Sequence, residues 1–128
     1  MSINLLIIRE SFRTKQFLLK LVCRFKSEEH KVKVKNILLD NIDKFLKSDY
    51  CLKGLLIEEH NEQGLFVPND RAKTLAVFGQ DSIEEILLDK RFTVPMNSFF
   101  QVHTDLAELL YSKVHMLVLR YLLSYIFN

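Results

Sequence analysis

The chain has 128 residues, of which 48% are hydrophobic and 27% charged, and its formal net charge is +2. This length suits one domain with one core, and the hydrophobic content excludes a disordered chain. The three glycines, Gly54, Gly64 and Gly79, stand alone, which excludes glycine-rich phosphate loops. Cys23 and Cys51 form no C-x-x-C motif, so we expect two buried free thiols.

The first third of the chain predicts a hairpin and a helix. Residues 3–8 (INLLII) form an apolar run and residues 17–25 (FLLKLVCRF) alternate between apolar and polar, which predicts two antiparallel strands. Ser27, followed by two glutamates, is typical of a helix start, and a helix over 28–47 follows. Its apolar stripe is predicted to comprise Val34, Ile37, Leu38, Ile42 and Phe45.

The middle of the chain predicts further strands. Residues 51–60 and 65–67 flank a turn-like segment and indicate a second hairpin, and residues 72–79 form another strand. Residues 83–94 read as two strands that reverse near Asp89 and Lys90, and Pro95 ends the pairing. The predicted fold class is mixed α/β (α+β), with a largely antiparallel sheet, one packed amphipathic helix and a C-terminal helix.

The last predicted element is an unusually apolar helix. Thr104 is placed to cap it, and from Val114 to Phe127 nearly every residue is apolar. This stretch is shorter than the roughly 20 residues that span a bilayer, so no membrane insertion is expected. A helix that is apolar all round must be covered, by a partner protein or by self-association. The N-terminus has no basic region ahead of its short apolar run, so we expect a cytoplasmic protein.

Positive charge is concentrated at the front of the chain. Residues 1–35 hold nine of the 18 Lys and Arg residues but three of the 16 Asp and Glu residues. Such a surface is typical of RNA binding, although a solvated sheet face has the same composition. The residues expected to contact phosphates are Arg9, Arg13, Lys15, Lys20, Arg24 and Lys26.

Residues with a recognisable catalytic pattern are scarce. The four histidines show no metal-ligand spacing, so no metal site is predicted. Glu58 and Glu59 are neighbours in a predicted strand and must point to opposite faces. The distinctive segment is Phe99-Phe100-Gln101, which lies between the end of a sheet and the start of a helix. Two rings and an amide suit a planar ligand with a polar edge; alternatively, both rings fill the core and Gln101 bonds to backbone.

A family resemblance favours the first interpretation. The string GQDSIEEILLDKRFTVPMNSFFQVHTDLAELLYSKV, residues 79–114, resembles a region of the S-adenosylmethionine-dependent RNA uracil-C5 methyltransferases, which modify 23S ribosomal RNA and transfer RNA. The matching features are Gly79, the strand at Phe92-Thr93-Val94, Ser98, Phe-Phe-Gln-Val at 99–102, and the helix core at 107–111. The resemblance extends less specifically over residues 5–114.

The resemblance implies S-adenosylmethionine as the methyl donor and ribosomal or transfer RNA as the acceptor. It implies that Gln101 contacts the donor and that Phe99 and Phe100 shape the same wall. His103 departs from the family, which has asparagine there, and an imidazole replaces one amide hydrogen bond and not both.

The resemblance also implies what a family enzyme needs besides this region. In the family a cysteine attacks C6 of uracil and a carboxylate base removes the C5 proton. Neither Cys23 nor Cys51 has the position of that nucleophile, and no Asp-Leu-Tyr-Cys-Gly segment follows residue 114. We therefore expect residues 1–114 to be the N-terminal part of a catalytic domain without its Rossmann-like core, and residues 115–128 to be an apolar helical tail. The expected protein is a truncated methyltransferase-like chain that is inactive alone; the alternatives are a small RNA-binding module and a protein-interaction domain.

Overall fold

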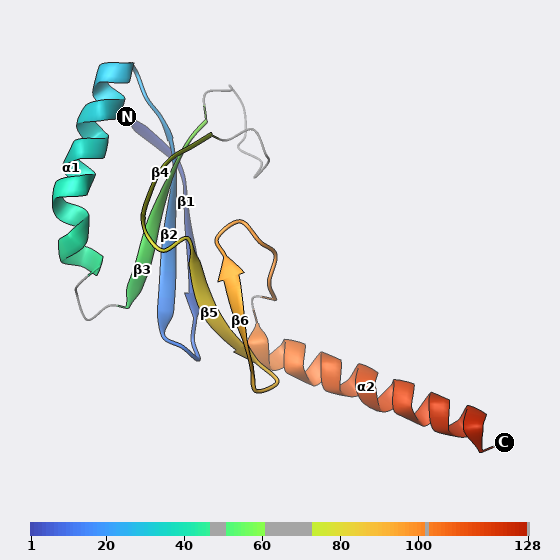
Figure 1. The fold of residues 1–128 in the computed structure, drawn as a ribbon. Coiled ribbons are helices and arrows are strands. Elements are labelled where there is room, and N and C mark those ends of the chain that lie inside the picture. The colour runs from blue at the N-terminus through green and yellow to red at the C-terminus, as the bar shows by residue number, and fades with distance from the viewer. Residues whose placement is uncertain (47–50, 61–72, 102, 128) are drawn as a thin grey trace.

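The structure, a computed structural model, describes residues 1–46, 51–60, 73–101 and 103–127. The described part is a mixed α/β arrangement that is rich in antiparallel strand pairs (Figure 1). The predicted strand at 65–67 and the turn before it fall outside the described residues. The elements are β1 (Ser2–Ser11), β2 (Gln16–Arg24), α1 (Glu28–Leu46), β3 (Leu52–Glu59), β4 (Lys73–Gly79), β5 (Ser82–Leu87), β6 (Lys90–Pro95) and α2 (Thr104–Ile126).

The strands form two sheets. The larger sheet has the order β1-β2-β3-β4, and β5 and β6 form a separate antiparallel pair. The predicted hairpin of β1 and β2 is confirmed, with Ile8 opposite Leu19. β2 and β3 run parallel, because α1 carries the chain back to the start of the sheet before β3 begins. This parallel pair is an exception within the predicted, mainly antiparallel pattern.

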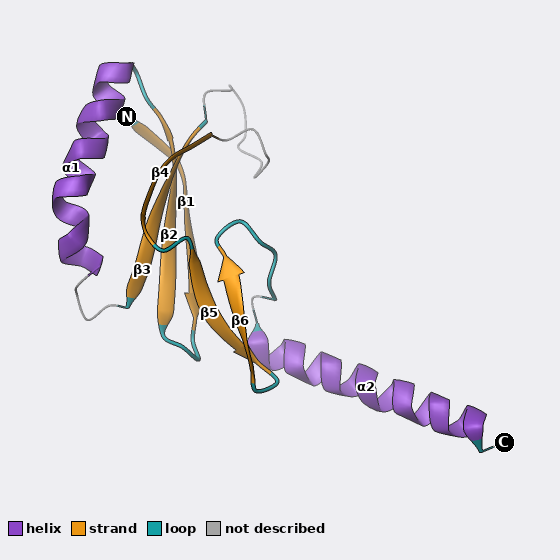
Figure 2. Ribbon diagram, viewed as in Figure 1, coloured by secondary structure: helices purple, strands orange, loops and turns teal. Residues whose placement is uncertain are grey.

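The large sheet buries both of its faces against different partners (Figure 2). The alternation predicted for β2 decides which residues go where. Leu19, Leu21 and Cys23 join the cluster beneath α1, whereas Leu18 joins Ile83 of β5 in the cluster on the opposite face. The result is three layers: α1, the four-stranded sheet, and the β5–β6 pair.

Helix α1 begins as predicted. The hydroxyl of Ser27 accepts a hydrogen bond from the backbone N–H of His30 at 3.2 Å, and two glutamates occupy the first turn. Leu38, Ile42 and Leu46 then pack on the sheet. Ile37, predicted to lie on this stripe, is 52% exposed. Residues spaced by four form one row on a helix, so the buried stripe follows that row and leaves Ile37 on its flank.

Gly54 and Gly79 allow the backbone of β3 to approach the end of β4. They lie opposite each other in the ladder, and the N–H of Gln80 donates to the carbonyl of Lys53 at 2.9 Å. A Cβ on Gly54 would overlap the carbonyl oxygen of Gln80. Gly79 has a φ of +73°, which lets the chain leave the large sheet and enter β5.

The reversal between β5 and β6 occurs at Leu88 and Asp89, one residue before the predicted position. Both residues have positive φ, 51° and 60°, as a tight two-residue turn requires. The N-terminal part of α2 holds this reversal, because Glu108 accepts a hydrogen bond from the N–H of Leu88 at 2.6 Å. Glu108 also forms an ion pair with Arg13, and Arg13 pairs with Asp105 at 2.7 Å. The acids of α2 therefore join the β1–β2 turn to the β5–β6 turn.

Helix α2 extends away from the sheets beyond its first turns (Figure 1). Its cap is His103 and not the predicted Thr104: the Nδ1 atom of His103 accepts from the N–H of Leu106 at 3.3 Å. Ala107 is the buried residue of this helix. The large apolar side chains that follow are exposed, from 40% for Tyr111 to 84% for Tyr125. Among the described helices, none has the length and apolar character required to cross a lipid bilayer.

The close approach at Gly54 generates a prediction. Gly54→Ala should lower the free energy of unfolding by about 1–3 kcal/mol, because the added methyl group must displace backbone. Urea unfolding followed by circular dichroism measures the change. Ser112→Thr, which adds one methyl group on the exposed helix α2, is the control and should change the value by less than about 0.5 kcal/mol. Equal stability of Gly54→Ala and the unsubstituted chain would contradict this packing.

The Glu108 contacts generate a second prediction. Hydrogen bonds from Arg13 and from the Leu88 N–H lower the pKa of Glu108 from 4.5 to about 2. Because the pKa is lower in the folded state, the contribution of the Glu108 carboxylate to the stability of the fold is complete above pH 4.5 and is lost as the pH falls toward 2. The thermal midpoint should therefore fall over this interval by more in the unsubstituted chain than in Glu108→Gln.

Asp40→Asn, at an exposed position of α1, is the control for the removal of one negative charge. It should keep the pH dependence of the unsubstituted chain. If Glu108→Gln and Asp40→Asn titrate identically, the lowered pKa of Glu108 is wrong.

Candidate functional site

The candidate site is built on the segment that follows β6. Pro95 ends the strand, and the chain turns at once, because the backbone N–H of Ser98 donates to the carbonyl of Pro95 at 3.1 Å and its hydroxyl does so at 2.8 Å. The side chain of Arg9, on β1, donates to the carbonyl of Ser98. These contacts aim the next three residues, Phe99 to Gln101, toward the open edge of the large sheet, where β1 is the outermost strand.

The three predicted site residues have different environments. Phe99 is 86% exposed. Phe100 packs on the core cluster that contains Leu18, and its ring lies 6.1 Å from that of Phe92 at an angle of 51°. Gln101 is half-buried. The alternative in which both rings fill the core is therefore wrong for Phe99 and right for Phe100.

Phe100 and Gln101 line a cavity of about 340 Å³ between β1 and the β5–β6 pair. That volume lies near the lower end of the range for small-molecule sites. Its apolar wall comes from β1, β5 and β6 and from Phe100, and its charged lining residues are Arg9, Glu10 and Glu85. The lining residues are Ile7, Ile8, Arg9, Glu10, Phe12, Ile83, Glu85, Val94, Phe100 and Gln101.

The polar groups of this cavity offer both donors and acceptors. Burial lowers the pKa of the Arg9 guanidinium from its ordinary value of 12.5. Glu85 is buried, and its carboxylate accepts a hydrogen bond from the Ile86 N–H at 3.0 Å. The amide of Gln101 forms no hydrogen bond within the described part of the chain. It is thus available to a ligand that presents a polar edge.

The cations predicted to contact RNA do not form one free surface. Lys20 is 6% exposed and pairs with Glu58 at 2.7 Å, so it cannot reach a phosphate and its predicted role is corrected. Lys20 lies on the face of β2 that the β5–β6 pair covers, so its side chain is shielded from solvent. Arg13 is engaged by two acids and Arg9 by the Ser98 carbonyl. Lys15 and Lys26 are exposed, and Arg24 is half-buried.

The remaining candidates for chemistry lie apart from this cavity. Glu58 and Glu59 point to opposite faces, as predicted: Glu58 pairs with Lys20, and Glu59 pairs with Lys31 of α1 at 2.8 Å. Cys23 is 1% exposed beneath α1, and burial raises the pKa of its thiol. Cys51 is exposed, contrary to the predicted burial. In the described residues, no group of three or more His, Cys, Asp or Glu side chains is arranged to hold a metal ion.

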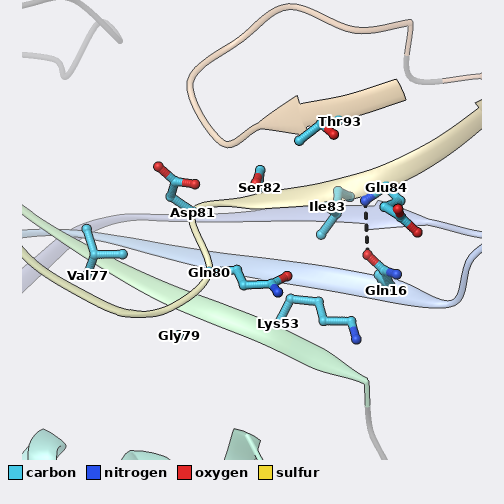
Figure 3. A pocket seen from close by; sticks show the side chains of 10 residues that line it. All are labelled: Gln16, Lys53, Val77, Gly79, Gln80, Asp81, Ser82, Ile83, Glu84 and Thr93. Atoms are coloured by element: carbon cyan, nitrogen blue, oxygen red, sulfur yellow. Dashed lines mark hydrogen bonds between the residues drawn. The ribbon is translucent and has the colours of Figure 1, made fainter. Parts of the chain in front are cut away.

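A second cavity, of about 730 Å³, lies where β4 passes into β5 (Figure 3). Its lining is mainly polar, and the Oε1 atom of Gln16 accepts from the Glu84 N–H at 2.9 Å across it. Glu84 is further engaged by Arg91 at 2.9 Å. None of the residues predicted to bind a ligand lines this cavity, and it has no aromatic wall. The first cavity is therefore the candidate site.

Several residues that line the first cavity were not predicted as site residues from the sequence. Glu10, Phe12 and Glu85 are far from Gln101 in the sequence, and the packing of β5 beside β1 brings them together. Arg9, which was predicted as a phosphate contact, donates to the carbonyl of Ser98 in the site loop. The sequence feature that could have indicated this cavity is Phe12, a large aromatic residue within the polar segment RESFRTK. In the structure Phe12 is 78% exposed.

Comparison with curated proteins identifies relatives of one kind. Two uncharacterized RNA methyltransferases of Clostridium acetobutylicum match, one with 43% identity over 49% of this chain and 13% of the relative, the other with 28% identity over 84% and 21%. The uncharacterized RNA methyltransferase YljE of Lactococcus lactis matches with 24% identity over 86% of this chain and 22% of its own length. The chain thus spans about a fifth or less of these relatives. No protein-family model matches it.

A solved structure has the same fold. It is the tRNA (uracil-54, C5)-methyltransferase of Pyrococcus abyssi in complex with S-adenosyl-L-homocysteine, which matches 85% of this chain and 23% of its own, with a TM-score of 0.57 and 19% identity. The relatives and the fold agree with the resemblance carried by the Phe-Phe-Gln-Val region. Over the part that it spans, the chain is similar in sequence to proteins named RNA methyltransferases and shares its fold with part of a tRNA uracil-C5 methyltransferase.

Proposed function

We propose that this chain supplies one wall of the methyl-donor site of an RNA uracil-C5 methyltransferase. The donor is S-adenosylmethionine, and the acceptor is a uridine of ribosomal or transfer RNA. The observation that carries the proposal is the position of Gln101, half-buried beside an apolar cavity of about 340 Å³ with its amide uncommitted. The similarity to proteins named RNA methyltransferases and the S-adenosyl-L-homocysteine bound to the solved neighbour support the assignment.

The geometry suits one part of the donor. Phe100 and Val94 give an apolar surface to a planar heterocycle, and the Gln101 amide can both donate and accept at its edge. Arg9 and Glu10 also line the cavity, and we propose that they face the charged groups of the donor. Phe99 is 86% exposed and is not among the residues that line this cavity, so the proposed role of Phe99 in the wall requires a ligand that extends beyond the cavity.

Catalysis requires more than this wall. A uracil-C5 transfer needs a reactive thiolate beside the donor. Cys23 is sealed beneath α1 with a raised pKa, which disfavours the thiolate, and Cys51 is exposed but does not line the candidate cavity. The chain spans 21–22% of the two relatives that match most of it. We therefore propose that residues 1–114 act as the first part of a catalytic domain, that residues 115–128 are a helical extension, and that the chain is inactive without further polypeptide.

The donor wall generates a prediction. At micromolar protein, calorimetry with S-adenosyl-L-homocysteine should show no binding, since one wall supplies less than about 4 kcal/mol, equivalent to a Kd weaker than about 1 mM. Nuclear magnetic resonance at millimolar ligand should then locate weak binding by shifts of the Gln101 side-chain amide and its neighbours. Gln101→Ala should abolish those shifts.

Gln80→Ala is the matched control, because Gln80 carries the same amide but lines the second cavity. It should leave the shifts around Gln101 unchanged. Ligand-induced shifts confined to Gln16 and Gln80, or none at all, would contradict the proposed donor wall.

A second function is favoured by the exposed helix α2. Its residues Leu110, Val114, Leu117 and Tyr121 recur at intervals of three and four, and their exposure ranges from 49% to 75%. A continuous apolar surface of this kind marks a protein contact. We infer that α2 associates with another apolar surface, and a second copy of the chain is the partner available in a pure sample.

The apolar surface of α2 generates a prediction. Light scattering coupled to size exclusion should give a mass above that of one 15.1 kDa chain, rising with concentration. Val114→Glu should return the mass to that of a monomer, because it buries a charge in the contact. Ser112→Glu places the same charge on the opposite side of the helix and should change the mass less. A monomer at all concentrations would remove self-association.

A further inference from the structure

An ion pair is buried between the large sheet and the segment that follows β6. The Nζ atom of Lys20 lies 2.7 Å from Oε2 of Glu58, and the two side chains are 8% and 4% exposed. Lys20 is on β2 and Glu58 is on the adjacent parallel strand β3. Both charges have left water, so each needs further hydrogen bonds.

Asn97 provides those hydrogen bonds. Its Oδ1 atom accepts from the Lys20 ammonium at 2.7 Å, and its Nδ2 group donates to Oε1 of Glu58 at 3.4 Å. An amide is the neutral side chain that offers an acceptor to the cation and a donor to the carboxylate at once. An aspartate in this position would repel Glu58, and an apolar residue would leave both charges short of partners.

The same amide belongs to the segment that carries the candidate site. Asn97 precedes Phe99 by two residues and Gln101 by four. The only other side chain described as bonding to this segment from the large sheet is Arg9, which donates to the Ser98 carbonyl. Phe100, in the core beside Phe92, holds the far end. Met96, directly before Asn97, is also buried in that core cluster, so Asn97 supplies the polar attachment of the segment between two apolar anchors, Met96 and Phe100.

We infer that Lys20 and Glu58 are positioning residues that act through Asn97 to hold the Phe99–Gln101 segment against the edge of the large sheet. The identity of the ligand that this segment binds rests on the proposed function, whereas the attachment of the segment to the large sheet does not. Lys20, counted from the sequence among the phosphate contacts, thereby acquires a different role. It points its charge inward and orders the loop from beneath.

The alternative is that the pair merely stabilises the sheet. A buried ion pair is a weak source of stability, since replacement of both partners by apolar residues of similar size is often neutral or favourable. A purely stabilising role predicts that such a replacement leaves the loop unchanged. A positioning role predicts that the loop loses its order although the sheet persists.

The test measures backbone order in the loop of the full chain by ¹⁵N relaxation. In the unsubstituted chain, Phe99, Phe100 and Gln101 should have order parameters near about 0.85, as rigid backbone does, and Asn97→Ala should lower them to below about 0.6. The strands β2 and β3 should keep their values. Asn41→Ala, on the exposed side of α1, is the matched control and should leave the loop rigid.

A second variant separates positioning from stability. Lys20→Met with Glu58→Met removes both charges and keeps similar volumes, so the sheet should still fold. The loop should become as mobile as in Asn97→Ala. Unchanged order parameters at residues 99–101 in both variants would overturn the inference, as would an equal loss of order across β2 and β3.

The donor experiment remains independent of this one. If Asn97→Ala loosens the loop and S-adenosyl-L-homocysteine produces no shifts at Gln101 in the unsubstituted chain, the positioning role stands and the donor wall fails. If shifts occur at Gln101 and Asn97→Ala leaves both the shifts and the order parameters unchanged, the donor wall stands and the positioning role fails.

Discussion

The burial of Lys20 and Glu58 on one face of the large sheet is the constraint on which the candidate site depends. Neither charge can remain there without further hydrogen bonds, and the group that satisfies both is Asn97. The requirement ties the segment after β6 to the centre of the sheet. It also explains why that segment, which contains no regular structure, places one ring in the core and the next amide at a cavity.

The two faces of the sheet have separate tasks. Beneath α1 an apolar cluster that includes Cys23 is accompanied by the ion pair of Glu59 with Lys31, whereas the opposite face combines the apolar cluster around Leu18 with the ion pair of Lys20 and Glu58. The first face attaches α1, and the second attaches the segment after β6 through Asn97. A relationship to methyltransferases agrees with this division, since a ligand site needs a rigid support more than it needs a mobile loop.

Helix α2 contrasts with the rest of the molecule. Its first two turns are tied down by Arg13 and by the N–H of Leu88, both of which bond to Glu108. Past those turns, apolar side chains face solvent along the remaining length. The same helix thus belongs to the domain at one end and presents a contact surface at the other, which accords with a chain that spans a fraction of its relatives' length.

Local pattern was sufficient to predict most of the elements. Alternation identified β2, the capping hydroxyl of Ser27 identified the start of α1, and Pro95 identified the end of β6, because each of these signals acts within a few residues. The Phe-Phe-Gln-Val region indicated the family for the same reason, as a contiguous motif. What the sequence by itself determined is therefore the order of the described elements, which residues of β2 share a face, and the resemblance to RNA methyltransferases.

Tertiary structure alone decided which polar residues meet. Lys20 and Asn97 are 77 positions apart, and Arg13 and Glu108 are 95 apart, so no local pattern marks either pair. The charge of Lys20 is the same in an exposed strand and in a covered one, which is why composition suggested a phosphate contact. Only the packing of the β5–β6 pair on the large sheet shows that this face excludes water, and exclusion of water turns the lysine into a structural partner of Glu58.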